Sequence, residues 1–125
     1  MHLYTFYDYC RTNDLESLKK MHKEYLLTKK FVTSGKNYAF RESCSRGYTE
    51  ICKWLYVTFD FNYNDIKILN NDCLFWACAY NHLDTIQFLM ETGAFTNMEL
   101  SNIRDKLSKK EGQDYVALCA PVGYE

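Results

Sequence analysis

Apolar residues recur along this chain at the spacing of an α-helix. Leu83, Ile86 and Leu89 follow one another at intervals of three residues, and a stripe with the same spacing begins at Leu15. Such a stripe gives a helix one apolar face and leaves the intervening polar residues on the other face. The pattern therefore predicts amphipathic helices.

A short polar turn precedes each of these stripes. Residues 12–14 read TND, residues 46–48 read RGY and residues 80–82 read YNH. Each turn contains glycine or asparagine, the residues that adopt a left-handed backbone at least cost. Two antiparallel helices joined by so short a turn must pack face to face, so we expect helical hairpins.

The cysteines mark a repeat. Cys10, Cys44 and Cys78 are evenly spaced along the chain, and their period lies within the range of repeat proteins. The positions four residues before and six residues after each cysteine agree in character: Phe6, Phe40 and Leu74 precede them, and Glu16, Glu50 and Asp84 follow them. The chain therefore contains three copies of one helical hairpin.

The third copy resembles an ankyrin repeat. It has Ala-Cys at 77–78 for the usual small pair, Asn-His-Leu-Asp at 81–84 for Gly-His-Leu-Glu, and a closing Gly-Ala at 93–94. The second copy, with Lys-Trp-Leu at 53–55, is similar to a variant common in ankyrin proteins of giant DNA viruses. The resemblance implies an all-α, short ankyrin-like solenoid. It also implies a non-enzymatic module that binds a partner protein through its concave face.

We expect one domain, residues 1–125, in four parts: a degenerate repeat at 4–36, a second repeat at 37–70, a third at 71–95, and a closing helix with a tail at 96–125. After Ala94 we expect the period to fail. Leu100, Ile103 and Leu107 form a stripe that would cover the third repeat. The tail, residues 113–125, is either folded back as a strap or free to engage a partner.

The connections at residues 25–36 and 60–70 are irregular for the family that the chain resembles. In the first connection, Leu26 and neighbouring apolar residues predict an extension of the preceding helix. Asn37 and Asn71 are candidate N-terminal caps for the first helices of the next two repeats.

Composition limits the classes of partner and the compartment. Fifteen basic and sixteen acidic residues give a net charge of −1, which provides no long-range field for nucleic acid or an anionic membrane. No apolar run reaches the length of about 18 residues that a membrane span needs. The six cysteines fall mostly within helical apolar patterns, which favours reduced core thiols and a cytoplasmic location. A disulfide framework is the alternative.

No pattern indicates catalysis, a cofactor or a metal site. Zinc ligands lie at about 2.0–2.3 Å from the ion, whereas packed helices are about 8–10 Å apart, so the three repeated cysteines cannot share an ion. His82 lies in a turn, where a histidine more often bonds backbone than abstracts a proton. The chain also lacks a glycine-rich phosphate loop.

The candidate partner-binding residues lie on the first helices of the repeats. Trp76 and Tyr80 are four residues apart and share a helix face, and Arg46, Arg41 and Glu42 lie on the preceding repeat. Aromatic residues and arginine dominate binding hot spots, so we predict a contact patch here. The alternative is that the closing helix partly buries Trp76.

A second hypothesis is a self-associating structural protein. A stack of so few repeats leaves apolar end faces. If these faces pack against those of other copies, the protein forms a homo-oligomer. The two hypotheses differ in the oligomeric state that they predict.

Overall fold

The computed structural model describes residues 2–109, which form nine helices and no strands. Three pairs of longer helices make up three hairpins: α1 (Leu3–Arg11) with α2 (Leu15–Tyr25), α4 (Ser34–Arg46) with α5 (Thr49–Thr58), and α7 (Ile68–Ala79) with α8 (Leu83–Glu91). The short helices α3 (Lys29–Val32) and α6 (Tyr63–Ile66) connect them, and α9 (Asn97–Ser108) follows the last pair. The predicted all-α solenoid is confirmed.

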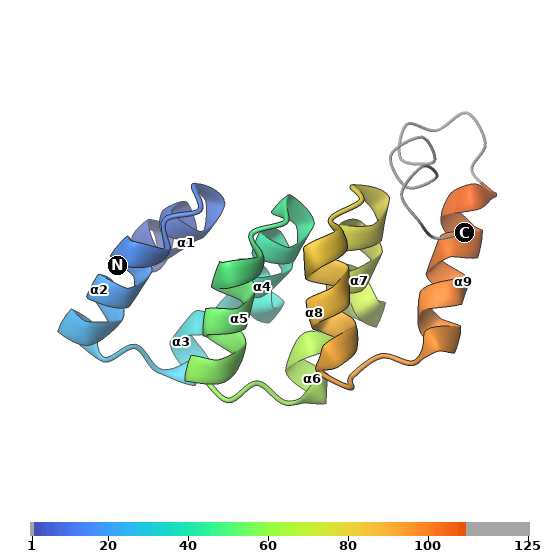
Figure 1. Ribbon diagram of the computed structural model, residues 1–125. Helices are drawn as coiled ribbons and strands as arrows, with labels where there is room; N and C mark the ends of the chain where they lie inside the picture. The colour runs from blue at the N-terminus through green and yellow to red at the C-terminus, as the bar shows by residue number, and fades with distance from the viewer. Residues whose placement is uncertain (1, 110–125) are drawn as a thin grey trace.

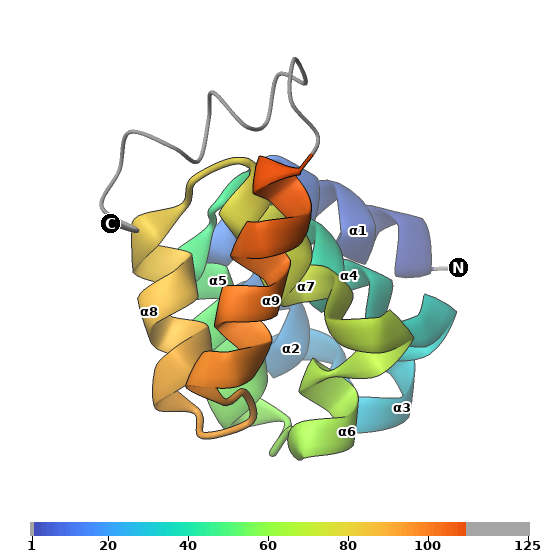
Figure 2. The same cartoon turned by 90° about the vertical axis from the view of Figure 1, so that its right-hand side faces the viewer.

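The hairpins stack in a row, and their helices form two layers (Figure 1). Helices α1, α4 and α7 make one layer, and α2, α5 and α8 make the other. Helix α4 packs against both α1 and α7, and α9 lies against α7 at the end of the row (Figure 2). The first helices of the three repeats therefore form one continuous surface.

The three turns within the hairpins share a left-handed residue. Asn13, Gly47 and Asn81 have φ of 59°, 77° and 62°, as the turn motifs predicted. A side chain at Gly47 would also collide with the His82 ring, because a Cβ atom there would overlap the imidazole. The His82 ring itself lies against the preceding turn, with Nε2 2.9 Å from the carbonyl oxygen of Ser45. The expectation that His82 bonds backbone is confirmed.

One hydrophobic core runs through all repeats, and the cysteines belong to it. Five cysteines are buried in it: Cys10, Cys44, Cys52, Cys73 and Cys78. The Sγ atoms of Cys44 and Cys52 are 3.4 Å apart. Burial raises the pKa of the Cys10 thiol to about 12 and also raises the pKa of Cys44. These thiols therefore serve as small apolar side chains, as expected. Cys119 and the tail, residues 113–125, lie outside the described residues.

The expected extension of α2 is wrong. The helix ends at Tyr25 because Leu26 adopts a left-handed backbone with φ of 51°. The imidazole Nδ1 of His22 accepts a hydrogen bond from the backbone N–H of Leu27 at 3.0 Å, which stabilises this turn. The apolar residues that follow belong to the separate helix α3.

Asn37 and Asn71 do not cap helices. Each ends a run of three left-handed residues, 35–37 in α4 and 69–71 in α7. The Asn37 side chain donates to the carbonyl oxygen of Asp65 at 3.0 Å, and that of Asn71 donates to the Glu99 carboxylate at 3.2 Å. Both asparagines thus bind one repeat to the next element along the stack.

The closing helix continues the period instead of ending it. The N-caps of α3, α6 and α9 are Thr28, Asn62 and Thr96, which recur at the same period as the three repeated cysteines. Each of these side chains accepts a backbone N–H three residues later. Helix α9 therefore begins like a connection to a fourth repeat, although it then runs straight. Its predicted stripe, Leu100, Ile103 and Leu107, is buried.

Candidate partner-binding surface

A chain of side-chain contacts links the first helices of all three repeats. It starts on α1, where Arg11 pairs with Asp8 and donates to the hydroxyl of Tyr38 at 3.2 Å. The ring of Tyr38 also packs edge-on against Tyr7, with centroids 4.7 Å apart. The first and second repeats are therefore joined across this surface by a polar and an aromatic contact.

Arg41 continues the chain from the second repeat to the third. Its guanidinium lies 5.9 Å from the centre of the Tyr38 ring and donates to the carbonyl oxygens of Lys36 at 2.8 Å and Gly35 at 3.1 Å. It also pairs with the carboxylate of Asp72 at 3.4 Å. The Arg41 side chain is only 19% exposed. Arg41 therefore bridges repeats and supports the left-handed backbone.

Asp72 connects Arg41 to the predicted aromatic pair, Trp76 and Tyr80. One oxygen of its carboxylate faces Arg41, and the other accepts a hydrogen bond from the indole N–H of Trp76 at 3.1 Å. The Trp76 ring stacks on Tyr80, with centroids 5.6 Å apart and planes 21° apart. Trp76 is half-buried, while Tyr80 is 45% exposed. The rings of Trp76 and Tyr80 therefore form one ledge, which the contacts from Arg41 through Asp72 hold in place.

Glu42 and Arg46 form a separate pair on the neighbouring repeat. The Arg46 Nε donates to the Glu42 carboxylate at 2.6 Å, and this contact raises the pKa of Arg46. Both side chains are partly exposed, at 43% for Arg46 and 24% for Glu42. A charged pair of this kind keeps a donor and an acceptor oriented toward solvent.

His82 connects the ledge to the second repeat. Its ring lies 6.2 Å from that of Tyr80, and its Nε2 contacts the carbonyl oxygen of Ser45, next to Arg46. The structure thus brings Arg41, Trp76 and Tyr80 into one network and places the Glu42–Arg46 pair beside it.

Sequence reasoning missed three members of the network: Tyr38, Asp72 and Arg11. A signal existed, because Tyr38 and Asp72 occupy the same position of consecutive repeats. That position faces the preceding repeat, so a residue there that can bond across the junction is a candidate bridge. Within residues 2–109, no group of three histidine, cysteine or acidic side chains is arranged to hold a metal ion.

The helix pairs, the left-handed turns and the regular repeat period define a solenoid of the ankyrin class. The family model for ankyrin repeats, in three copies, matches residues 7–100, so the chain belongs to the ankyrin-repeat family. No curated protein and no solved structure gave a significant match. Ankyrin repeats are generally protein–protein interaction modules and are typically non-enzymatic. In the described part of the chain, no helix is long and apolar enough to cross a membrane.

Proposed function

We propose that this chain is a non-enzymatic module that binds a partner protein through the surface of its first helices. Trp76 and Tyr80 supply the apolar contact area, and Glu42 and Arg46 supply a donor and an acceptor beside it. Arg41 acts mainly by holding Asp72 and, through it, Trp76. The partner is a protein of the reducing cytoplasm, and of the infected host's cytoplasm if the Lys-Trp-Leu likeness reflects a viral origin.

The observation that carries this proposal is the anchored ledge. Aromatic side chains that are held rigidly lose little entropy on binding, and tryptophan, tyrosine and arginine dominate hot spots. The indole of Trp76 in the Trp76–Tyr80 stack is held by Asp72 of the same helix, and Asp72 is paired with Arg41 of the second repeat.

Site-specific cross-linking tests the location of the surface. A photoreactive residue at position 80 is expected to capture a partner, whereas the same residue at Lys53, which is exposed on α5, is not. With the captured protein purified, the Trp76→Ala/Tyr80→Ala variant should lower affinity by at least about tenfold. Tyr63→Ala removes a comparably exposed aromatic ring from α6 and serves as the control.

Two results would contradict the proposal. One is equal binding by the double variant while its circular dichroism matches that of the wild type. The other is an unfolded Trp76→Ala variant, which would make Trp76 a structural residue. Self-association, the alternative function, predicts a concentration-dependent mass by analytical ultracentrifugation, and a monomer at high micromolar concentration would argue against it.

A further inference from the structure

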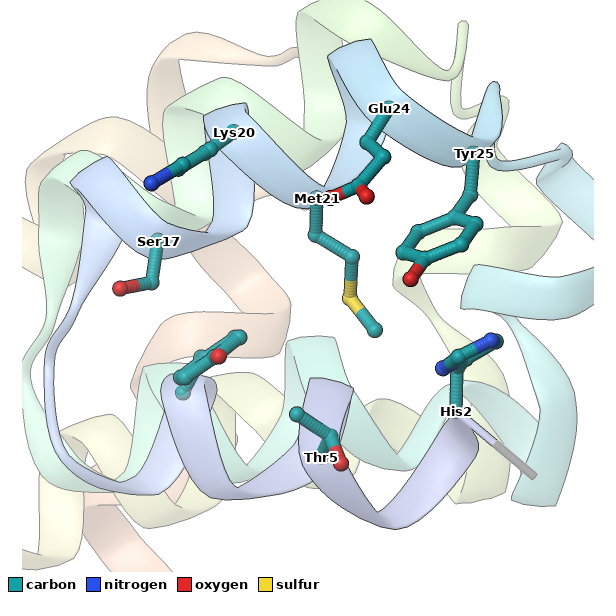
Figure 3. A pocket seen from close by; sticks show the side chains of 8 residues that line it. His2, Thr5, Ser17, Lys20, Met21, Glu24 and Tyr25 are labelled. Atoms are coloured by element: carbon teal, nitrogen blue, oxygen red, sulfur yellow. The ribbon is translucent and has the colours of Figure 1, made fainter.

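A groove opens on the outer side of the first repeat, between α1 and α2 (Figure 3). It has a volume of about 330 Å³ and lies on the face away from the second repeat. His2 and Tyr25 stack at one end, with ring centroids 4.3 Å apart. The Met21 side chain points into the space between the helices, and Thr5 lies across from it. Tyr9, Ser17 and the charged residues Lys20 and Glu24 also line the groove.

The repeat period shows what this groove corresponds to. Its lining residues Thr5, Tyr9, Ser17 and Met21 have counterparts one and two periods later in the chain. All eight counterparts are completely buried: Ala39, Ser43, Ile51, Leu55, Cys73, Ala77, Thr85 and Leu89. The groove is therefore the same surface that the second and third repeats use for stacking.

Contacts across the junctions confirm which way this surface faces. Ser43 lies beside the thiol of Cys10 in the first repeat, and Cys73 lies beside the thiol of Cys44 in the second. Each of these positions thus meets the preceding repeat. In the first repeat the equivalent positions, Tyr9 and Thr5, meet no preceding repeat in the described chain, so the groove is the continuation of an existing interface.

The other end of the stack shows what can cover the opposite stacking surface of a repeat. There a single amphipathic helix, α9, buries Leu100, Ile103 and Leu107 against the third repeat. A second copy of this chain suits the groove poorly. Two grooves facing each other would enclose a void, which close-packed interfaces avoid. The outer side of α9 is also a poor match for the groove, because Asn102, Asp105 and Lys106 are exposed there.

We propose that the groove between α1 and α2 binds an amphipathic helix of a partner protein. The apolar residues of that helix, spaced at i, i+3, i+4 and i+7, would lie over Met21 and Tyr9, as preceding helices lie over Leu55 and Ser43. This surface is separate from the Trp76–Tyr80 ledge. The protein then holds two partners, one along its first helices and one at its N-terminal end.

A pair of designed peptides tests this inference with the whole chain, residues 1–125. The first peptide is helical with leucine at i, i+3, i+4 and i+7 and polar residues elsewhere, and the second has the same composition in scrambled order. In NMR titrations of the isotope-labelled protein, the striped peptide should shift the amide signals of Thr5, Tyr9, Ser17 and Met21. The scrambled peptide should not shift them.

Two variants decide whether the groove is the site. Thr5→Arg and Ser17→Arg place a long charged side chain in the groove at positions that are not fully buried, so folding should persist. Each should weaken binding of the striped peptide by at least about tenfold, the loss typical of a disrupted hot spot. Tyr80→Ala, on the separate ledge, should leave the affinity unchanged.

Three outcomes would overturn the inference. They are equal binding of the two peptides, binding that persists in both arginine variants, and amide shifts that map to the surface of α1, α4 and α7. A stable dimer with the groove residues protected would also overturn it, because a second copy would then be the occupant.

Discussion

Each end of the helical stack has a surface suited to stacking, but within the described chain only the C-terminal one is covered by a further helix. At the C-terminal end, α9 packs against α7 of the third repeat, where Leu74 and Cys78 are completely buried. At the N-terminal end the groove is open, and Thr5 is exposed where its counterparts Ala39 and Cys73 are buried. An ankyrin end face is thus either covered by one helix or made partly polar.

The difference shows how the residue types in a stacking surface depend on whether a neighbouring repeat covers it. Ser17 stands in the open groove, whereas its counterpart in the second repeat is Ile51. Met21, a flexible side chain, replaces Leu55 and Leu89 of the later repeats. This mixture of small polar and flexible apolar residues avoids a large exposed apolar patch while no neighbour is bound. It also leaves a surface on which a neighbour can pack.

The largest contrast should come from placing a charge at each end. Leu107→Asp puts a carboxylate where the native side chain is 1% exposed, and we expect a loss of about 3–5 kcal/mol in the free energy of unfolding. Thr5→Asp, on the open face, should cost less than about 0.5 kcal/mol. Urea denaturation followed by circular dichroism measures both. Equal losses would mean that the groove is not an open face.

A smaller contrast should come from one repeat position, changed where a preceding repeat covers it and where none does. Leu89→Ala should cost about 2–5 kcal/mol, because Leu89 is completely enclosed and its removal leaves a cavity. Met21→Ala, at the equivalent position, should fall at the lower end of this range, about 2 kcal/mol, because Met21 is 5% exposed and no preceding repeat of the described chain covers it. Thermal denaturation of both variants checks the order. A Met21 variant as unstable as the Leu89 variant would contradict it.

The attachment of α9 should depend on pH through Glu99. Its hydrogen bond with Lys67, at 2.7 Å, lowers the pKa of Glu99 from 4.5 to about 2. The ionised carboxylate therefore stabilises the folded state fully above pH 4.5, and this stabilisation is lost as the pH falls toward 2. Because both side chains are partly exposed, Glu99→Gln should cost only about 1 kcal/mol at neutral pH.

Urea titrations at several pH values would test this linkage. The stability difference between the wild type and Glu99→Gln should shrink between pH 4.5 and about pH 2. Glu24→Gln, on the rim of the open groove, is the matched change at the other end and should cost less than about 0.5 kcal/mol at neutral pH. A difference that stays constant across the acidic range would show that Glu99 is not held by its ion pair.

The smallest effect should appear in thiol reactivity. Burial raises the pKa of both Cys10 and Cys44, so each should react with iodoacetamide only when its repeat opens. The uncovered first repeat should open more readily, and Cys10 should be modified about threefold faster than Cys44. Mass spectrometry of proteolytic peptides measures the two rates. Faster modification of Cys44 would contradict the view that the open end is the weaker one.

The hairpins could be predicted from the sequence because their signals are local and repeated. Two signals are enough to predict the repeated hairpins. They are the even spacing of Cys10, Cys44 and Cys78 and the glycine or asparagine in each turn. The end of α2 could not be predicted, because leucine is an unusual left-handed residue and Leu26 continues an apolar run. The turn at Leu26 is stabilised by a hydrogen bond from the Leu27 backbone to the His22 ring, which no sequence pattern reveals.

The candidate surface was predictable in part for the same reason. Trp76 and Tyr80 are one helical turn apart, so their shared face follows from spacing alone. The bridge between Arg41 and Asp72 joins two repeats, and it depends on how far the repeats are offset when they stack. That offset is a property of the whole assembly, and the left-handed segments before both helices help to set it.

The ion pairs between successive connections have a consequence for how such a protein can lengthen. Lys29 pairs with Asp65 at 2.8 Å, and Lys67 pairs with Glu99 at 2.7 Å, so each acid occupies the same position of consecutive repeats. The middle repeat carries an acid for the unit before it and a base for the unit after it. An in-frame duplication of residues 37–70 would therefore insert a unit whose junctions are already matched, and growth by tandem duplication requires no compensating substitution there.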